Sequence, residues 1–316
     1  MFSRSAPYIL LLSFLYGSTL VISRFSVGQY DPRVYISLRL SLAAVAYAVV
    51  YWTSTWGGRP KRLWPRDRSV LLHAAILGII GTAIPMTSIV SSLQYQSTGV
   101  TSMLLTLNPA ITVVLAQIFL ADEPMTWRKT AGVIVALVGA AFLLLQGETG
   151  LADFAQADWR GYAWAGVGIL GSAAASVYAR RFMRTMDTWD VASVRMIAAA
   201  ATIVPVTYFT VGFDLSRVNA VGYAALLYAA LVGTFLGMWL SFYVVKRFGA
   251  TPASQTSYII PVISTTLGAL VLGEVVTPIM LLGMVIIFTG IALLNSKPRA
   301  ALRAHSRDAV TPQAGD

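Results

Sequence analysis

Cysteine is absent from the 316-residue chain, and histidine occurs only twice, as His73 and His305. The missing cysteines exclude disulfides, thiolate nucleophiles and cysteine-ligated zinc. The scarcity of histidine leaves little imidazole for metal binding or for activating a nucleophile. We therefore predict that the chain binds no cofactor or metal and is not an enzyme.

Charged residues are also scarce, at 11% of the chain against 57% hydrophobic residues. Soluble domains carry about 25% charged residues. A helix needs about 20 apolar residues to cross the hydrocarbon core of a bilayer. Long apolar runs recur along the chain, so we predict an all-α integral membrane protein with ten transmembrane helices. The predicted spans cover residues 8–27, 33–52, 69–90, 97–120, 126–146, 161–182, 189–211, 219–244, 252–273 and 277–296.

The thirteen acidic residues avoid the middles of these spans. Intramembrane aspartyl proteases need paired aspartates inside their spans, and proton- or sodium-driven carriers often keep a buried carboxylate there. Glu123 and Glu274 each come just before a span. We interpret them as structural residues that favour a helix N-terminus, with a role in ion coupling as the alternative.

The net charge of +10 reflects basic residues scattered over short loops. If the N-terminus is cytoplasmic, 17 of the 23 Lys and Arg residues lie on the cytoplasmic side and four lie outside. This bias is typical of topogenic charge rather than of nucleic-acid binding. We therefore predict a multi-pass protein of the plasma (inner) membrane with both termini cytoplasmic. Residues 297–316 are predicted to form a disordered basic tail.

A pattern of one glutamate and two glycines occurs twice. Glu123, Gly132 and Gly139 match Glu274, Gly283 and Gly290 at an offset of 151 residues, and other pairs follow at offsets up to 156. The halves are then residues 1–149 and 150–296. Each half holds five spans, which is an odd number, so the second half enters the membrane inverted. Inverted repeats of this kind are common in secondary transporters and favour alternating access.

The duplicated segments, "LADEP" followed by two glycines and "LGE" followed by two glycines, resemble the drug/metabolite transporter superfamily in its EamA-type branch. The resemblance covers about residues 6–296. It implies a transporter that exports amino acids or related small metabolites, and it does not name the substrate. Two alternatives stay open: a multidrug or quaternary-ammonium efflux protein, and a membrane scaffold without transport.

Two prolines interrupt apolar spans at matching positions of the halves. Pro109 and Pro261 are 152 residues apart, and Pro85 matches Gly237 at the same offset. Proline inside a helix removes one backbone hydrogen bond and costs roughly 3 kcal/mol. Paired interruptions near the midplane point to a binding site, so we predict that these four residues are hinges.

Several spans carry neutral polar or aromatic side chains suited to a neutral or zwitterionic solute with an apolar part. The candidates for a substrate cavity are Tyr16, Ser18, Thr82, Met86, Thr101, Asn108, Thr234, Trp239, Gln255 and Tyr258. Polar residues in spans also serve simply to hold helices together, and this remains the alternative for each of them.

Two arginines lie inside predicted spans, each about six residues from the start of its span. We expect Arg39 and Arg195 to extend toward the lipid headgroups or to cap a neighbouring helix, with a charged gate as the sharper alternative. Small residues such as Gly132 and Gly139 predict close helix packing, so spans 5 and 10 are predicted to be scaffold helices or the contact of a homodimer.

Overall fold

The computed structural model describes residues 5–53, 64–120, 125–152 and 158–296. Within these ranges the regular structure is entirely helical. The first half contains α1 (Ala6–Val27), α2 (Pro32–Thr53), α3 (Arg68–Gly78), η1 (Ile79–Ala83), α4 (Ile84–Ser92), α5 (Thr98–Leu105), α6 (Asn108–Phe119) and α7 (Trp127–Leu145). The second contains α8 (Trp159–Phe182), α9 (Thr188–Thr210), α10 (Ala220–Leu227), η3 (Tyr228–Leu236), α11 (Gly237–Phe248), α12 (Ala250–Ser254), α13 (Thr256–Leu272) and α14 (Pro278–Asn295).

Many helices begin at a residue whose side chain accepts a hydrogen bond from a backbone N–H of the first turn. Such caps satisfy donors that have no partner inside the helix. They are Asp67, Ser97, Thr126, Asp158, Asp187, Asn219 and Thr277. The short polar segments between apolar runs therefore determine where the helices start.

Nine helical segments in the described ranges are long and apolar enough to cross a membrane. They match nine of the ten predicted spans, and the exception is the sixth. α8 is long, at 24 residues, but its sequence is rich in Gly, Ala and Ser and has the lower mean hydropathy that those residues bring. Small residues permit close contact here: a Cβ added at Gly168 or Gly171 would lie within 3 Å of α4 side chains.

Two helical segments contain a widened π-type turn, η1 between α3 and α4 and η3 between α10 and α11. π-Turns carry one extra residue and occur often at functional sites. Gly81 of η1 and Gly233 of η3 lie 152 residues apart in sequence. Each faces a helix of the other half: Gly81 packs on Ala175 of α8, and Gly233 packs on Thr19 of α1.

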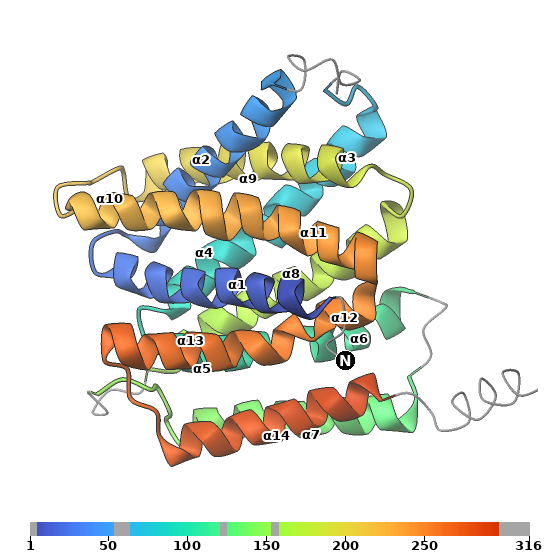
Figure 1. Ribbon diagram of the computed structural model, residues 1–316, viewed down its shortest axis with the longest axis vertical. Helices are drawn as coiled ribbons and strands as arrows, with labels where there is room; N and C mark the ends of the chain where they lie inside the picture. Colours follow the sequence, from blue (N-terminus) through green and yellow to red (C-terminus); the bar gives the residue numbers. More distant parts are fainter. Residues whose placement is uncertain (1–4, 54–63, 121–124, 153–157, 297–316) are drawn as a thin grey trace, which may run out of the picture.

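A large buried apolar cluster surrounds the contact between α2 and α9. Tyr35, Ile36 and Leu40 of α2 and Met196 and Ala199 of α9 are fully buried there. Hydroxyl groups add to the contact, because Ser37 and Thr207 lie 2.6 Å apart. Figure 1 shows these two helices crossing, with α10 and α11 alongside.

α7 and α14 form a separate close pair along one edge of the molecule (Figure 1). Glycines bring their backbones together: a Cβ on Gly132 would lie 2.7 Å from the carbonyl oxygen of Gly290, and one on Gly139 would lie 2.9 Å from the amide of Ile287. The predicted small-residue faces are therefore used inside the chain. Leu145 and Val285 point outward and are exposed, as lipid-facing side chains are.

Candidate functional site

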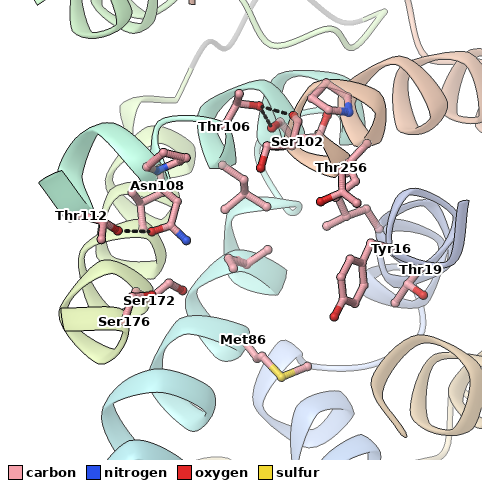
Figure 2. Close-up of a pocket in the computed structure, with 18 of the residues that line it drawn as sticks. Tyr16, Thr19, Met86, Ser102, Thr106, Asn108, Thr112, Ser172, Ser176 and Thr256 are labelled. Carbon is pink, nitrogen blue, oxygen red and sulfur yellow. Dashed lines mark hydrogen bonds between the residues drawn. The ribbon is translucent and has the colours of Figure 1, made fainter. Parts of the chain in front are cut away.

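A cavity of about 700 Å³ opens between the two halves of the chain. Its wall combines hydroxyl and amide groups with apolar side chains. Residues that line it include Tyr16, Thr19, Leu20, Ser23, Arg39, Met86, Ile89, Ser102, Thr106, Asn108, Thr112, Ser172, Ser176, Thr234, Met238, Ser257, Ile260 and Asn295. Figure 2 shows Asn108 and Thr112 on one side of this space and Tyr16 and Thr19 on the other.

Four of the ten predicted cavity residues lie in this wall, namely Tyr16, Met86, Asn108 and Thr234. The hydroxyl of Tyr16 donates to the carbonyl of Gly237 at 3.2 Å, so it joins α1 to the start of α11. The amide oxygen of Asn108 accepts from Thr112 at 3.2 Å, one turn later on α6.

The other six predicted residues lie outside the wall. Three make contacts within the helix bundle: Ser18 lies 2.8 Å from the hydroxyl of Tyr228, Thr82 accepts from Arg195, and the hydroxyl of Thr101 accepts from Gln96. These hydroxyls join neighbouring elements, which was the alternative reading for them.

The remaining three each adjoin a lining residue in sequence but do not line the cavity themselves. Trp239 lines a smaller pocket of about 250 Å³ and stacks on Tyr243. Gln255 is exposed. Tyr258 stands behind the wall, where its hydroxyl accepts from the wall residue Asn295 at 3.1 Å.

The sequence predicted that Arg39 and Arg195 extend toward the lipid headgroups or cap a neighbouring helix. In the structure both side chains instead bind groups inside the helix bundle. Arg39 is only 6% exposed, and its guanidinium donates to Thr234 at 2.8 Å and to Ser23 at 3.2 Å. Arg195 donates to Thr82 and to the carbonyl of Gly81. Neither side chain extends toward the headgroups, because each has hydrogen-bond acceptors on a π-turn of the opposite half. The alternative prediction, capping of a neighbouring element, describes Arg195, which donates to the carbonyl of Gly81.

Two of the residues predicted to be hinges, Pro85 and Pro261, lack the backbone N–H that a helix carbonyl would bind, and side chains of the opposite half donate to these carbonyls. Pro85 lacks the N–H that could bond to Gly81, and Gly81 accepts from Arg195 instead. Pro261 lies inside α13 and leaves the carbonyl of Ser257 free, and the Thr106 hydroxyl donates to it at 3.3 Å. A buried carbonyl needs such a partner.

Pro109 differs from this pattern. It lies in the first turn of α6, because α5 ends at Leu105 and a new helix begins at Asn108. Proline is well tolerated in a first helical turn. The expected cost of an interior proline therefore does not arise here, and the span is broken rather than bent.

Contacts between α5 and α13 lie next to the cavity. The hydroxyl oxygen of Thr98, the first residue of α5, lies 3.1 Å from the carbonyl oxygen of Ser264. The hydroxyls of Ser264 and Ser102 lie 2.6 Å apart. Ser102 lines the cavity, and Thr98, one turn earlier, does not.

Glu274 belongs to this group of contacts. Its carboxylate accepts from the backbone N–H of Thr98 at 2.9 Å and from the Thr98 hydroxyl at 2.5 Å. The sequence predicted that Glu274 would favour the N-terminus of the following helix, but that position is capped by Thr277. Glu274 instead accepts hydrogen bonds at the N-terminus of α5, which lies in the other half of the chain. Its counterpart Glu123 lies outside the described residues.

The protonation of Glu274 gives a testable pH dependence. Burial raises the pKa of Glu274 and outweighs the lowering by the hydrogen bonds from Thr98. The folded protein thus holds this proton more tightly than the unfolded chain, where the pKa is near 4.5. The stabilising contribution is present below pH 4.5 and is lost as pH rises through the folded-state pKa.

We expect the melting temperature of the purified protein to fall with pH over that window, and the fall to be absent in Glu274→Gln. Asp214→Asn is the control, because hydrogen bonds that Ser216 donates lower the pKa of Asp214, so any effect of its titration on stability occurs at lower pH. If Glu274→Gln folds and exchanges substrate but has lost pH-driven transport, Glu274 is a coupling residue and our structural interpretation is wrong.

Sequence reasoning missed several wall residues, among them Ser23, Ser102, Thr106, Ser172 and Ser176. A signal was present. Tyr16, Thr19 and Ser23 follow helical spacing on one face of α1, and the pairs Ser102–Thr106 and Ser172–Ser176 are four residues apart. Small hydroxyl residues are common in spans, so this spacing becomes informative only when the facing helix is known.

A family model described as the EamA-like transporter family matches the chain twice, over residues 4–145 and 159–296. An uncharacterized transporter of Bacillus subtilis, YyaM, is 25% identical over 295 residues, which is 90% of this chain and 92% of that protein. A probable terminal-alkyne amino-acid exporter of Streptantibioticus cattleyicolor is 28% identical over 276 residues, 87% of this chain and 86% of that protein.

A further relative is YedA of Escherichia coli K12, an uncharacterized inner membrane transporter, with 23% identity over 292 residues, 90% of this chain and 88% of that protein. A solved crystal structure matches 93% of this chain and 98% of its own with a TM-score of 0.63 at 21% identity, which shows a shared fold. The duplicated motif, the apolar helices and the double family match agree. The chain belongs to the EamA-like transporter family and is a membrane transporter of the drug/metabolite type.

Proposed function

We propose that the protein exports amino acids or related small metabolites by alternating access between two inverted repeats. The observation that carries this proposal is the cavity between the halves, which is lined by residues of both. A site shared by two repeats suits alternating access, because movement of one repeat against the other can expose it to either side in turn. The amino-acid exporter among the relatives supports the substrate class.

The repeats are proposed as residues 1–149 and 150–296, followed by the tail at 297–316, with α8 as the sixth of ten spans. Reciprocal contacts support this division. Arg39 of the first half binds Thr234 in η3, and Arg195 of the second binds Thr82 in η1. Thr82 and Thr234 are 152 residues apart, close to the offset of the duplicated motif. The two family-model matches also fall one in each half.

The proposed orientation places both termini in the cytoplasm and the protein in the inner membrane. We expect Ser216→Cys, exposed between α9 and α10, to react with an impermeant thiol reagent in intact cells. Ser69→Cys, exposed at the start of α3, should react only after the membrane is opened. The native chain has no cysteine, so labelling reports the introduced thiol alone. The reverse pattern would invert the topology.

The wall of the cavity favours zwitterionic or anionic solutes over cationic ones. Arg39 is the charged group among the described residues that line it, and the other polar groups are hydroxyls and amides. A quaternary-ammonium substrate would meet a like charge there, which disfavours the multidrug alternative. A scaffold without transport has no need for such a cavity.

Flux through the purified protein tests the proposal. Proteoliposomes loaded with a radiolabelled amino acid should release it faster than protein-free liposomes loaded in the same way. Unlabelled amino acid outside should accelerate the release by exchange. The panel starts with branched and aromatic amino acids and includes tetraethylammonium, each with and without a pH gradient. Exchange of tetraethylammonium but of no amino acid would favour the efflux alternative.

A homodimer through spans 5 and 10 stays a proposal. The glycine faces of α7 and α14 are occupied by each other. A second copy would therefore have to pack on their outward apolar faces, where Leu137, Val138 and Leu282 are exposed.

A further inference from the structure

We propose that the guanidinium of Arg39 binds the carboxylate group of the transported solute. This inference rests on the proposed function, because it assigns the substrate chemistry of the same cavity. Arg39 lies in the wall of the cavity, yet the residue is 94% buried, since its exposed fraction is 6%. A charge in that position interacts strongly with any ligand that enters.

The guanidinium is held in place by two hydroxyl groups that can only accept from it. Thr234 donates its own proton to the carbonyl of Ala229 at 3.0 Å, and Ser23 donates to the carbonyl of Thr19 at 2.7 Å. Their remaining lone pairs receive Nε and Nη1 of Arg39 at 2.8 and 3.2 Å. Arg39 is therefore oriented before a ligand arrives, which reduces the entropy cost of binding.

These partners orient the charge but do not neutralise it. In the ranges that the structure describes, Arg39 forms no ion pair, and no Asp or Glu lines the cavity. Arginine has five N–H donors. Thr234 and Ser23 take two of them, and the hydroxyl of Tyr35 also contacts the side chain, which leaves donors for a ligand. A buried charge without a counter-ion is costly, and a carboxylate offsets that cost with two parallel hydrogen bonds.

Arg195 shows by contrast what a fully structural arginine looks like here. It makes the equivalent contact with Thr82, but it also donates Nη2 to the backbone carbonyl of Gly81. It does not line the cavity. Of the two arginines, only Arg39 faces the space that a solute can occupy in this state.

The test measures equilibrium binding to the purified full-length protein with ligands that differ in one group. Leucine and isovalerate carry the carboxylate, whereas leucinamide does not. We expect wild-type protein to bind the two carboxylates about tenfold more tightly than leucinamide, or better, because hydrogen bonds to charged groups are the stronger ones. Arg39→Gln should weaken carboxylate binding about 10- to 100-fold. It should not weaken leucinamide, whose ammonium group is repelled by the arginine in wild type.

Asn108→Ala is the matched control, because Asn108 is a neutral residue of the same wall. It should weaken leucine and leucinamide alike. Arg39→Lys keeps the charge but loses the paired donors, so its loss for carboxylates should be smaller than that of Arg39→Gln. If Arg39→Gln does not fold, the test is whether wild type and Arg39→Lys bind leucine and isovalerate more tightly than leucinamide.

Equal loss of acid and amide in Arg39→Gln would overturn the proposal and make Arg39 structural, and so would a wild-type protein without preference for the acid. Failure of isovalerate and of every proteinogenic amino acid to bind would also overturn it. Carboxylate binding without amino-acid flux would instead reject the proposed export and leave Arg39 as a carboxylate site. Flux of leucine and leucinamide at equal rates would instead support transport and reject Arg39 as a carboxylate site.

Discussion

Replacing Gly290 with alanine should lower the free energy of unfolding by about 3 kcal/mol, the upper part of the usual range for overpacking. A Cβ at this position would lie 2.7 Å from the carbonyl oxygen of Gly132 and 2.8 Å from the Cα of Ala136. These are backbone atoms of α7, so no side-chain rotation can relieve the contact. The two helices would have to move apart along their whole interface.

The control is Gly166→Ala on α8, where an added Cβ meets no atom within 4 Å. Alanine has the higher helix propensity, by about 1 kcal/mol, so this variant should be as stable as wild type or more so. Thermal unfolding in detergent, followed by intrinsic fluorescence, compares the two. Equal stability of both variants would show that α7 and α14 are not packed as described.

Replacing Pro261 with alanine should slow transport about 10- to 100-fold while the protein becomes more stable. Alanine restores an N–H that can bond to the carbonyl of Ser257, which now accepts from Thr106 of the other half. It also removes a proline that costs about 3 kcal/mol inside a helix. If α13 must bend during transport, the alanine stabilises the unbent helix and so raises the activation free energy of the conformational step. Each additional 1.36 kcal/mol slows that step tenfold.

Pro205→Ala is the matched control, because Pro205 also lies inside a helix, α9, but does not line the cavity. It should gain stability and keep its transport rate. Counterflow in proteoliposomes and melting temperature are measured for both variants. By inversion, Pro109→Ala should bias access toward the opposite side, although its place in a first helical turn makes the gain in stability smaller. Normal rates in Pro261→Ala and Pro109→Ala would show that these prolines are ordinary packing residues.

Most of the fold was predictable because it follows from local properties of the chain. Apolar runs must be helical in a membrane, since the backbone has no water to bond with. The helix starts follow from caps such as Asp67 and Ser97, which act within one turn. α8 shows the limit: its small residues allow close packing on α4, and they also lower the apolarity by which a span is recognised.

The candidate site was predicted less completely, because a cavity is defined by several helices at once. Thr82 and Thr234 occupy equivalent places in the two halves, yet only Thr234 lines the cavity in this structure. The two halves have similar sequences but different surroundings in any one access state. No property of a single half distinguishes such a pair.

The sequence by itself determined the membrane class, the approximate span limits, the duplicated motif and the family. These depend on composition and on spacing along the chain, which are local or periodic properties. Only the tertiary structure decided which partners the buried polar groups take. Arg39 and Arg195 bind π-turns of the opposite half, and Glu274 caps α5 rather than the helix that follows it. Buried charges and freed carbonyls are satisfied by whichever acceptor or donor packing brings within about 3 Å, and that neighbour can be more than a hundred residues away.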